Sequence, residues 1–192
     1  MLLIIVVFAE TGLFFGFFLP GDSLLVTAGL LCGTKTFNTH IATLLISLSL
    51  AATLGNIVGY LFGKKVGKSL FTRKDSFFFR KDYVILAEKF FEKYGGMALV
   101  MGRFLPIIRT FAPILAGVIT MNFKRFMWYN ILGCVLWVFG LTLSGYFLGS
   151  RIPWVQNYLG YIVIALIIIT AIPVIRTYLV ERKKFKNDKA EK

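Results

Sequence analysis

The sequence predicts an all-α membrane protein, in which polytopic helices are combined with two opposed re-entrant hairpins that form an inverted repeat. Three observations support this fold class. The composition is strongly apolar, long uncharged runs alternate with basic segments, and a proline-containing motif occurs twice at a constant spacing. We expect residues 1–192 to form a single membrane domain.

The composition is unlike that of a protein whose main solvent is water. Of the 192 residues, 57% are hydrophobic and 16% are charged, and the mean hydropathy is +0.76. These values lie outside the usual range of soluble globular domains. Uncharged runs at residues 36–63, 126–150 and 156–175 reach the roughly 20 residues that a helix needs to cross a bilayer. Three full spans are therefore predicted.

The placement of basic residues predicts the topology. The net charge is +13, with nine Lys or Arg residues at positions 64–93 and six at 181–192. Such clusters beside apolar runs are typical of cytoplasmic segments under the positive-inside rule, and they would contact anionic lipid headgroups. We therefore expect a multi-pass protein of the bacterial inner membrane with a cytoplasmic C-terminus, and no nucleic-acid partner.

These signals divide the membrane domain into five consecutive parts. The predicted parts are a first repeat with a re-entrant hairpin and a span (1–67), a basic cytoplasmic amphipathic linker (68–94), a second repeat with a hairpin and a span (95–150), a final span (151–180) and a basic cytoplasmic tail (181–192).

The two hairpins are predicted from parity and from proline. The apolar stretch 95–121 lies between two segments that should both be cytoplasmic, so it must enter the membrane and return to the same side. The stretch 12–31 has a similar break in its middle. Four residues are expected to shape these hairpins rather than to contact a substrate: Pro20, Gly21, Pro106 and Pro113.

The repeat relates residues that are 86 positions apart. Gly16, Phe18, Leu19 and Pro20 correspond to Gly102, Phe104, Leu105 and Pro106, and Gly59, Tyr60 and Gly63 correspond to Gly145, Tyr146 and Gly149. The charge bias gives the two copies opposite orientations. An inverted repeat of this kind is the architecture by which many secondary transporters build a substrate site near the membrane midplane.

Four charged residues fall within the predicted hairpins. The acids Glu10 and Asp22 belong to the first copy, and Arg103 and Arg109 belong to the second. A charge at the bilayer centre costs about 2.5 to 3.5 kcal/mol on insertion scales, so these side chains need partners, water or a task. Ion pairing alone is one reading, but buried salt bridges are poor stabilisers because desolvation offsets their attraction.

The functional reading assigns each residue type a chemistry. Arg103 and Arg109 are candidate substrate-binding residues, because guanidinium groups bind phosphate oxygens bidentately. Glu10 and Asp22 are candidates for proton coupling or gating, since burial favours the protonated form of a carboxyl group. Asn56 and Asn130, polar within apolar spans, are expected to form interhelical hydrogen bonds or to line a cavity.

We expect neither an enzyme nor a metal or cofactor site. Cys32 and Cys134 lie far apart in apolar surroundings, and His40 is the single histidine. This composition lacks the spacing of a metal site and the histidine pair of a phosphohistidine phosphatase. The two cysteines are therefore interpreted as packing residues.

Three motifs carry a family resemblance: ETGLFFGFFLPGDSLL (10–25), GNIVGYLFGKKVG (55–67) and GRFLPIIRTFAPILAGVITM (102–121). They resemble the DedA family, also described through the SNARE-associated Golgi protein or VTT domain. The resemblance implies opposed re-entrant hairpins, an inner-membrane location, and an essential acidic pair and arginine pair at Glu10, Asp22, Arg103 and Arg109. Many family members have a longer segment before the glutamate than the nine residues here, so the first helix, its orientation and the presence of a segment upstream of Met1 stay open.

The resemblance also implies a function. Family members look like lipid-phosphate translocases, notably for undecaprenyl phosphate recycling, so the expected partners are polyprenyl phosphate or phospholipid headgroups and a coupling proton or other ion. Two alternatives stay open: a proton-coupled exporter of a small cation or drug, and a non-transporting membrane organiser. A homo-oligomer is compatible with each of them.

Overall fold

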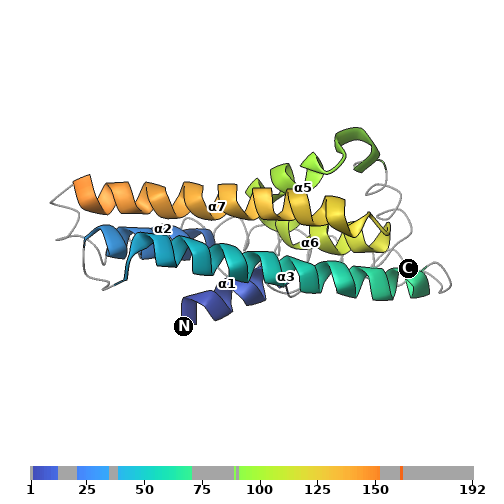
Figure 1. Cartoon of the computed structure of the whole chain (residues 1–192), viewed down its shortest axis with the longest axis horizontal. Helices are drawn as coiled ribbons and strands as arrows, with labels where there is room; N and C mark the ends of the chain where they lie inside the picture. Colours follow the sequence, from blue (N-terminus) through green and yellow to red (C-terminus); the bar gives the residue numbers. More distant parts are fainter. Residues whose placement is uncertain are drawn as a thin grey trace, which may run out of the picture. The chain divides into compact units, whose positions relative to one another are not determined.

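The computed structural model describes residues 2–12, 21–34, 39–70, 89, 91–151 and 161, and the side chains at 68–70, 106 and 107 are not included. Every element in this part of the chain is helical, which confirms the all-α class (Figure 1). The elements are α1 (Leu2–Gly12), α2 (Gly21–Gly33), α3 (Ile41–Leu70), α5 (Met97–Met101), the 3-10 helix η2 (Gly102–Phe104), α6 (Pro106–Val118) and α7 (Phe123–Arg151). The predicted final span and tail, and most of the linker 68–94, lie outside the described residues.

Helices α3 and α7 confirm two of the predicted spans. Residues Ile41–Gly67 of α3 and Phe123–Arg151 of α7 are long and apolar enough to cross a bilayer. Large apolar side chains such as Leu50, Leu54 and Trp128 are exposed along them, as is usual for faces that meet lipid. Both helices continue beyond the uncharged runs into the neighbouring basic residues. Long Lys and Arg side chains can reach polar surroundings from within a helix, so these residues do not end it.

The contacts between Cα atoms divide the chain into two compact units. The first contains residues 1–19 and 39–141, and the second contains residues 20–38 and 142–192. The division falls within α7. Each unit is therefore described by itself.

In the first unit, α3 and α7 run antiparallel. The basic end of α3 is its C-terminal end, and the basic end of α7 is its N-terminal end. The rings of Tyr60 and Phe126 stack with centroids 4.4 Å apart, and Asn130 lies beside Thr53, further from the basic end of each helix. The C-terminal end of α3 and the N-terminal end of α7, where Asn122 caps the helix, therefore lie at one end of this unit. The predicted entry and return of stretch 95–121 requires the segments on either side of it to lie at one end, as they do here.

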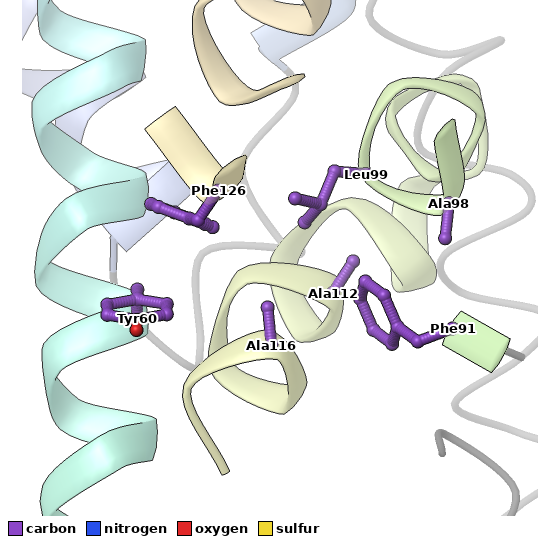
Figure 2. Packing of buried hydrophobic residues seen from close by; sticks show 7 residues of the cluster. All are labelled: Tyr60, Phe91, Ala98, Leu99, Ala112, Ala116 and Phe126. Atoms are coloured by element: carbon purple, nitrogen blue, oxygen red, sulfur yellow. The ribbon is translucent and has the colours of Figure 1, made fainter. Parts of the chain in front are cut away.

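A cluster of buried side chains joins α3, α5, α6 and α7 near this basic end. Figure 2 shows Tyr60 and Phe126 facing the small side chains of α6, with the α5 residues and Phe91 beyond them. The cluster consists of Tyr60, Phe91, Ala98, Leu99, Ala112, Ala116 and Phe126. The small alanines of α6 let the aromatic rings approach its backbone, so the cluster fixes α6 against the two long helices.

Glycines set the remaining contacts of α3. A Cβ atom on Gly12 of α1 would lie 2.9 Å from the Gly55 carbonyl oxygen, and one on Gly67 would lie 2.9 Å from the Cα atom of Val118 in α6. Only glycine allows these backbones to approach so closely. Membrane helices commonly associate through small residues of this kind.

The proline break at Pro106 is confirmed, whereas the predicted break at Pro113 is wrong. Leu105 is extended (φ −112°, ψ 113°), and α6 begins directly after it with Pro106 in its first turn, where the missing N–H is not needed. Pro113 lies inside the continuous helix α6. A Cβ atom on Gly59 would lie 3.6 Å from the Cβ atom of Pro113, so packing against α3 helps to offset the lost hydrogen bond.

Segment 97–118 leaves the basic end of the first unit and returns to it. A Cβ on Gly96 would touch the ring of Tyr129, Arg103 lies beside Gly133, and Gly67 near the end of α3 packs on Val118. The turn at Leu105 is thus its point furthest from the basic end. This path has the form of a hairpin, and its entry into a bilayer and the inverted relation of the two copies remain predictions.

In the second unit, α2 packs against the last part of α7. A Cβ on Gly149 would lie close to the Leu30 carbonyl, and one on Gly145 would meet the Val26 carbonyl. Helix α2 begins at Gly21, directly after Pro20, which itself lies outside the described residues. The helix after each predicted proline break therefore packs on the glycines of the long helix from the other copy: α6 on α3, and α2 on α7.

Candidate functional site

A buried ion pair joins α1 to α6. The guanidinium of Arg109 on α6 donates through Nη2 to the Glu10 carboxylate on α1. Glu10 is fully buried and Arg109 is 3% exposed. The guanidinium also lies over the Trp137 ring of α7, with 4.8 Å from its central carbon to the ring centroid. The electron-rich ring face adds a second attraction for this cation.

Arg103 lies about one helical turn nearer the basic end of α7. Its Nη2 atom donates to the Asn130 side-chain oxygen at 2.8 Å, and the residue is 3% exposed. A Cβ atom at Gly133 would lie 2.9 Å from both Cδ and Nε of Arg103. The absence of a side chain at Gly133 therefore gives Arg103 its path along α7.

Two asparagines, Asn56 of α3 and Asn130 of α7, lie beside Arg103. The Asn130 amide nitrogen donates to the Thr53 backbone oxygen at 3.2 Å, which fixes the amide so that its oxygen faces Arg103. The Asn56 amide nitrogen donates to the Thr11 backbone oxygen of α1 at 3.1 Å, and its oxygen accepts from Arg103.

The two arginines therefore have different partners. Arg109 contacts a carboxylate, whereas Arg103 contacts the amide oxygens of Asn130 and Asn56 and lies beside the Cys134 thiol. The Nη1 atom of Arg103 is buried and has no hydrogen-bond partner there. A buried donor without a partner costs about 1 to 3 kcal/mol, more when it is charged. The site thus contains one compensated cation and one that is ready to accept an anion.

The family comparison agrees with the sequence motifs. The VTT domain model matches residues 19–147. The chain is 39% identical over 172 residues to protein DedA of Escherichia coli, with 90% of this chain and 78% of that protein covered. A membrane protein of Mycobacterium tuberculosis is 40% identical over 190 residues, covering 97% of this chain and 83% of the relative.

The chain belongs to the DedA family. The inner membrane protein YqjA of Escherichia coli is a further relative, 37% identical over 148 residues, which cover 77% of this chain and 66% of that protein. The names of these relatives place DedA-family proteins in membranes, in agreement with the two long apolar helices. No solved structure matches the chain significantly.

Three of the four charges predicted for this DedA-family site lie in one unit. Glu10, Arg103 and Arg109 are buried, with both arginines beside α7 and Glu10 paired to Arg109. Asp22 lies in the first turn of α2, in the second unit, and is half-buried. The proton-coupling or gating role of Asp22 therefore remains a prediction. Gly21, predicted to shape the first hairpin, is the buried first residue of α2.

The interhelical role predicted for the asparagines is confirmed by the hydrogen bonds from Asn130 to the Thr53 backbone oxygen of α3 and from Asn56 to the Thr11 backbone oxygen of α1. Sequence reasoning missed Trp137 and Gly133, since tryptophan and glycine are common in apolar spans and carry no signal of a charged neighbour. Both cysteines are buried thiols that form no disulfide, but Cys134 also lies 3.6 Å from the Asn130 oxygen and so borders the site. Among the described residues, no cluster of His, Cys, Asp and Glu could hold a metal ion.

Proposed function

We propose that this DedA-family protein is a lipid-phosphate translocase, which moves a polyprenyl phosphate such as undecaprenyl phosphate across the bacterial inner membrane. The observation that supports this proposal most is Arg103, a buried cation held by neutral acceptors with one terminal nitrogen open. A phosphate monoester supplies the anionic oxygens that a guanidinium binds best. No covalent chemistry on the substrate is proposed.

The depth of the arginines supports a site within the membrane. Arg103 contacts Gly133, ten residues into α7, which at 1.5 Å per residue is about 15 Å from the basic end. Half of a typical hydrocarbon core is also about 15 Å thick. A phosphate bound to Arg103 would therefore be near the middle of its path, while the polyprenyl tail stays in the lipid outside α3 and α7.

We propose that the ion pair between Glu10 and Arg109 couples this movement to protons. A proton on Glu10 removes the negative charge that Arg109 contacts, so the guanidinium becomes available to the phosphate beside Arg103. Loss of the proton restores the pair and expels the anion. Asp22 is proposed as a second, gating acid, since its place in the first turn of α2 puts it near the positive end of the helix dipole.

A translocation assay tests the transport function. The full chain is reconstituted in liposomes with a short-chain polyprenyl phosphate in the outer leaflet, and the fraction still accessible to an added phosphatase is followed over time. We expect Arg103→Ala and Arg109→Ala to slow translocation about tenfold or more, since each removes a charged hydrogen bond. Arg125→Ala, which removes an exposed arginine of α7, is the matched control and should leave the rate unchanged.

The remaining outcomes separate the alternative functions. Equal rates for wild type and both arginine variants would refute a lipid-phosphate translocase. Proton-coupled movement of a small cation that survives in the double arginine variant but is lost in Glu10→Gln would identify an exporter. Rescue of a strain that lacks this gene, by a protein that shows no transport activity, would identify a membrane organiser.

The proposed proton coupling predicts a pH dependence of translocation. In wild type, the rate should rise as the pH falls through the range in which Glu10 takes up its proton, because the protonated state releases Arg109. Glu10→Gln should remove this part of the dependence and leave the smaller one that arises from the second ionisation of the phosphate, near pH 6. Identical profiles for wild type and Glu10→Gln would show that Glu10 is not the coupling acid.

A further inference from the structure

The two arginines differ in a way that extends the proposed function, on which this inference rests. Both are buried to the same degree, yet Arg109 contacts Glu10 and Arg103 contacts amide oxygens. A carboxylate beside a guanidinium competes directly with an incoming phosphate, whereas an amide oxygen leaves the positive charge in place. The chemistry of the acceptors therefore determines which arginine is ready to bind an anion.

We propose that Arg103 is the resident anion-binding residue, and that Asn56 and Asn130 are positioning residues that hold its guanidinium while preserving its positive charge. Asn130 fixes Nη2 through its oxygen, and its own amide nitrogen is anchored on the Thr53 backbone oxygen of α3. Gly133 of α7 leaves room for the stem of Arg103. The open Nη1 atom is the donor that meets the phosphate oxygen.

Asn56 connects this network to the helix that carries Glu10. Its amide nitrogen donates to the Thr11 backbone oxygen of α1 at 3.1 Å, and its oxygen accepts from Arg103. Asn56 and Asn130 therefore both meet Arg103 with neutral amide oxygens, which leave the charge of the site unchanged.

A charge-changing substitution tests the role of the asparagines. Asn130→Asp keeps the shape of the side chain and still accepts from Arg103, but it places a carboxylate where a neutral oxygen stood. Binding is measured by calorimetry on the full chain in detergent micelles, with farnesyl phosphate and inorganic phosphate as separate probes and farnesol as the uncharged control. We expect Asn130→Asp to weaken binding of farnesyl phosphate about tenfold or more.

The controls distinguish a positioning role from a structural one. Asn122→Asp adds the same charge to the exposed cap of α7 and should leave both binding and the melting temperature unchanged. Asn56→Asp adds a carboxylate from α3 and should weaken binding as Asn130→Asp does, so the test does not depend on one variant folding. Glu10→Gln removes the competing carboxylate and should retain or strengthen binding.

A double-mutant cycle shows whether Asn130 acts through Arg103. In an Arg103→Gln background, Asn130→Asp should have no further effect on binding, because the charge that it neutralises has gone. An undiminished effect in that background, or wild-type affinity in both Asn130→Asp and Asn56→Asp, would overturn the inference. So would binding that is lost in Arg109→Gln but retained in Arg103→Gln.

The outcomes also separate this inference from the proposed function. If Asn130→Asp and Asn56→Asp both bind farnesyl phosphate with the affinity of wild type, the proposed translocase remains, but its anion is held by Arg109. Binding of inorganic phosphate as tight as that of farnesyl phosphate would identify the free anion rather than the lipid as the ligand, with the roles of Arg103 and the asparagines intact. Binding of neither probe would remove both proposals.

Discussion

At the scale of single residues, the site is organised by what surrounds each charge. Burying an ion costs several kcal/mol even after relaxation, and an ion pair repays this only in part. In this DedA-family protein the described site contains two buried guanidinium groups and one buried carboxylate, which contacts Arg109. The imbalance favours an anionic ligand over a purely structural role.

Gly133 provides a residue-scale prediction about the path of Arg103. We expect Gly133→Val to displace the Arg103 stem and to slow translocation about tenfold, since its Cβ would lie 2.9 Å from Cδ and Nε. Gly140→Val is the control on the same helix, because a Cβ there meets nothing within 4 Å. The initial rates in liposomes are compared, and equal rates for the two variants would show that the path of Arg103 does not matter.

At the scale of elements, two prolines of one segment have opposite roles. Pro106 follows an extended residue and begins α6, whereas Pro113 is accommodated within that helix. The effect of a proline thus depends on its position relative to the start of the helix. The sequence indicates a helix start at Pro106. Pro113 lies on the side of α6 that packs near Gly59 of a distant helix, and no local pattern reveals that contact.

These roles predict different results when the prolines are replaced. Pro113→Ala restores a backbone N–H inside α6 and removes a penalty of up to about 3 kcal/mol, so the melting temperature should stay the same or rise and translocation should persist. Pro106→Ala lifts the restriction that keeps Leu105 extended, so helices α5 and α6 can fuse and translocation should fall. Thermal unfolding and the translocation rate are measured for both, and loss of transport in Pro113→Ala alone would contradict these roles.

At the scale of the whole molecule, the two copies of the predicted repeat share one kind of helix contact. Gly63 of α3 and Gly149 of α7, which are related by the repeat, each meet a backbone carbonyl of the helix that follows a proline break: Ile114 of α6 and Leu30 of α2. We expect Gly63→Val and Gly149→Val to destabilise the protein similarly, by about 1 to 3 kcal/mol each. A large effect of one and none of the other, in denaturation experiments, would argue against equivalent copies.

Much of this architecture could be predicted from the sequence, because its signals are local. The uncharged runs identified α3 and α7, and charges in apolar surroundings identified Glu10, Arg103 and Arg109. Which acid pairs with which arginine could not be predicted, since it depends on how α1 and α6 pack on α3. The uneven partners of the two arginines follow from the same tertiary contacts.

The most direct test of the site is a distance measured in a membrane. With guanidinium groups labelled with 15N and a bound polyprenyl phosphate, dipolar recoupling between 31P and 15N reports contacts within about 4 Å, the separation expected for a charged hydrogen bond. We predict a strong signal in wild type that is lost in Arg103→Lys and kept in Arg125→Lys. A signal that survives Arg103→Lys and disappears in Arg125→Lys would place the phosphate at the basic end and contradict this account.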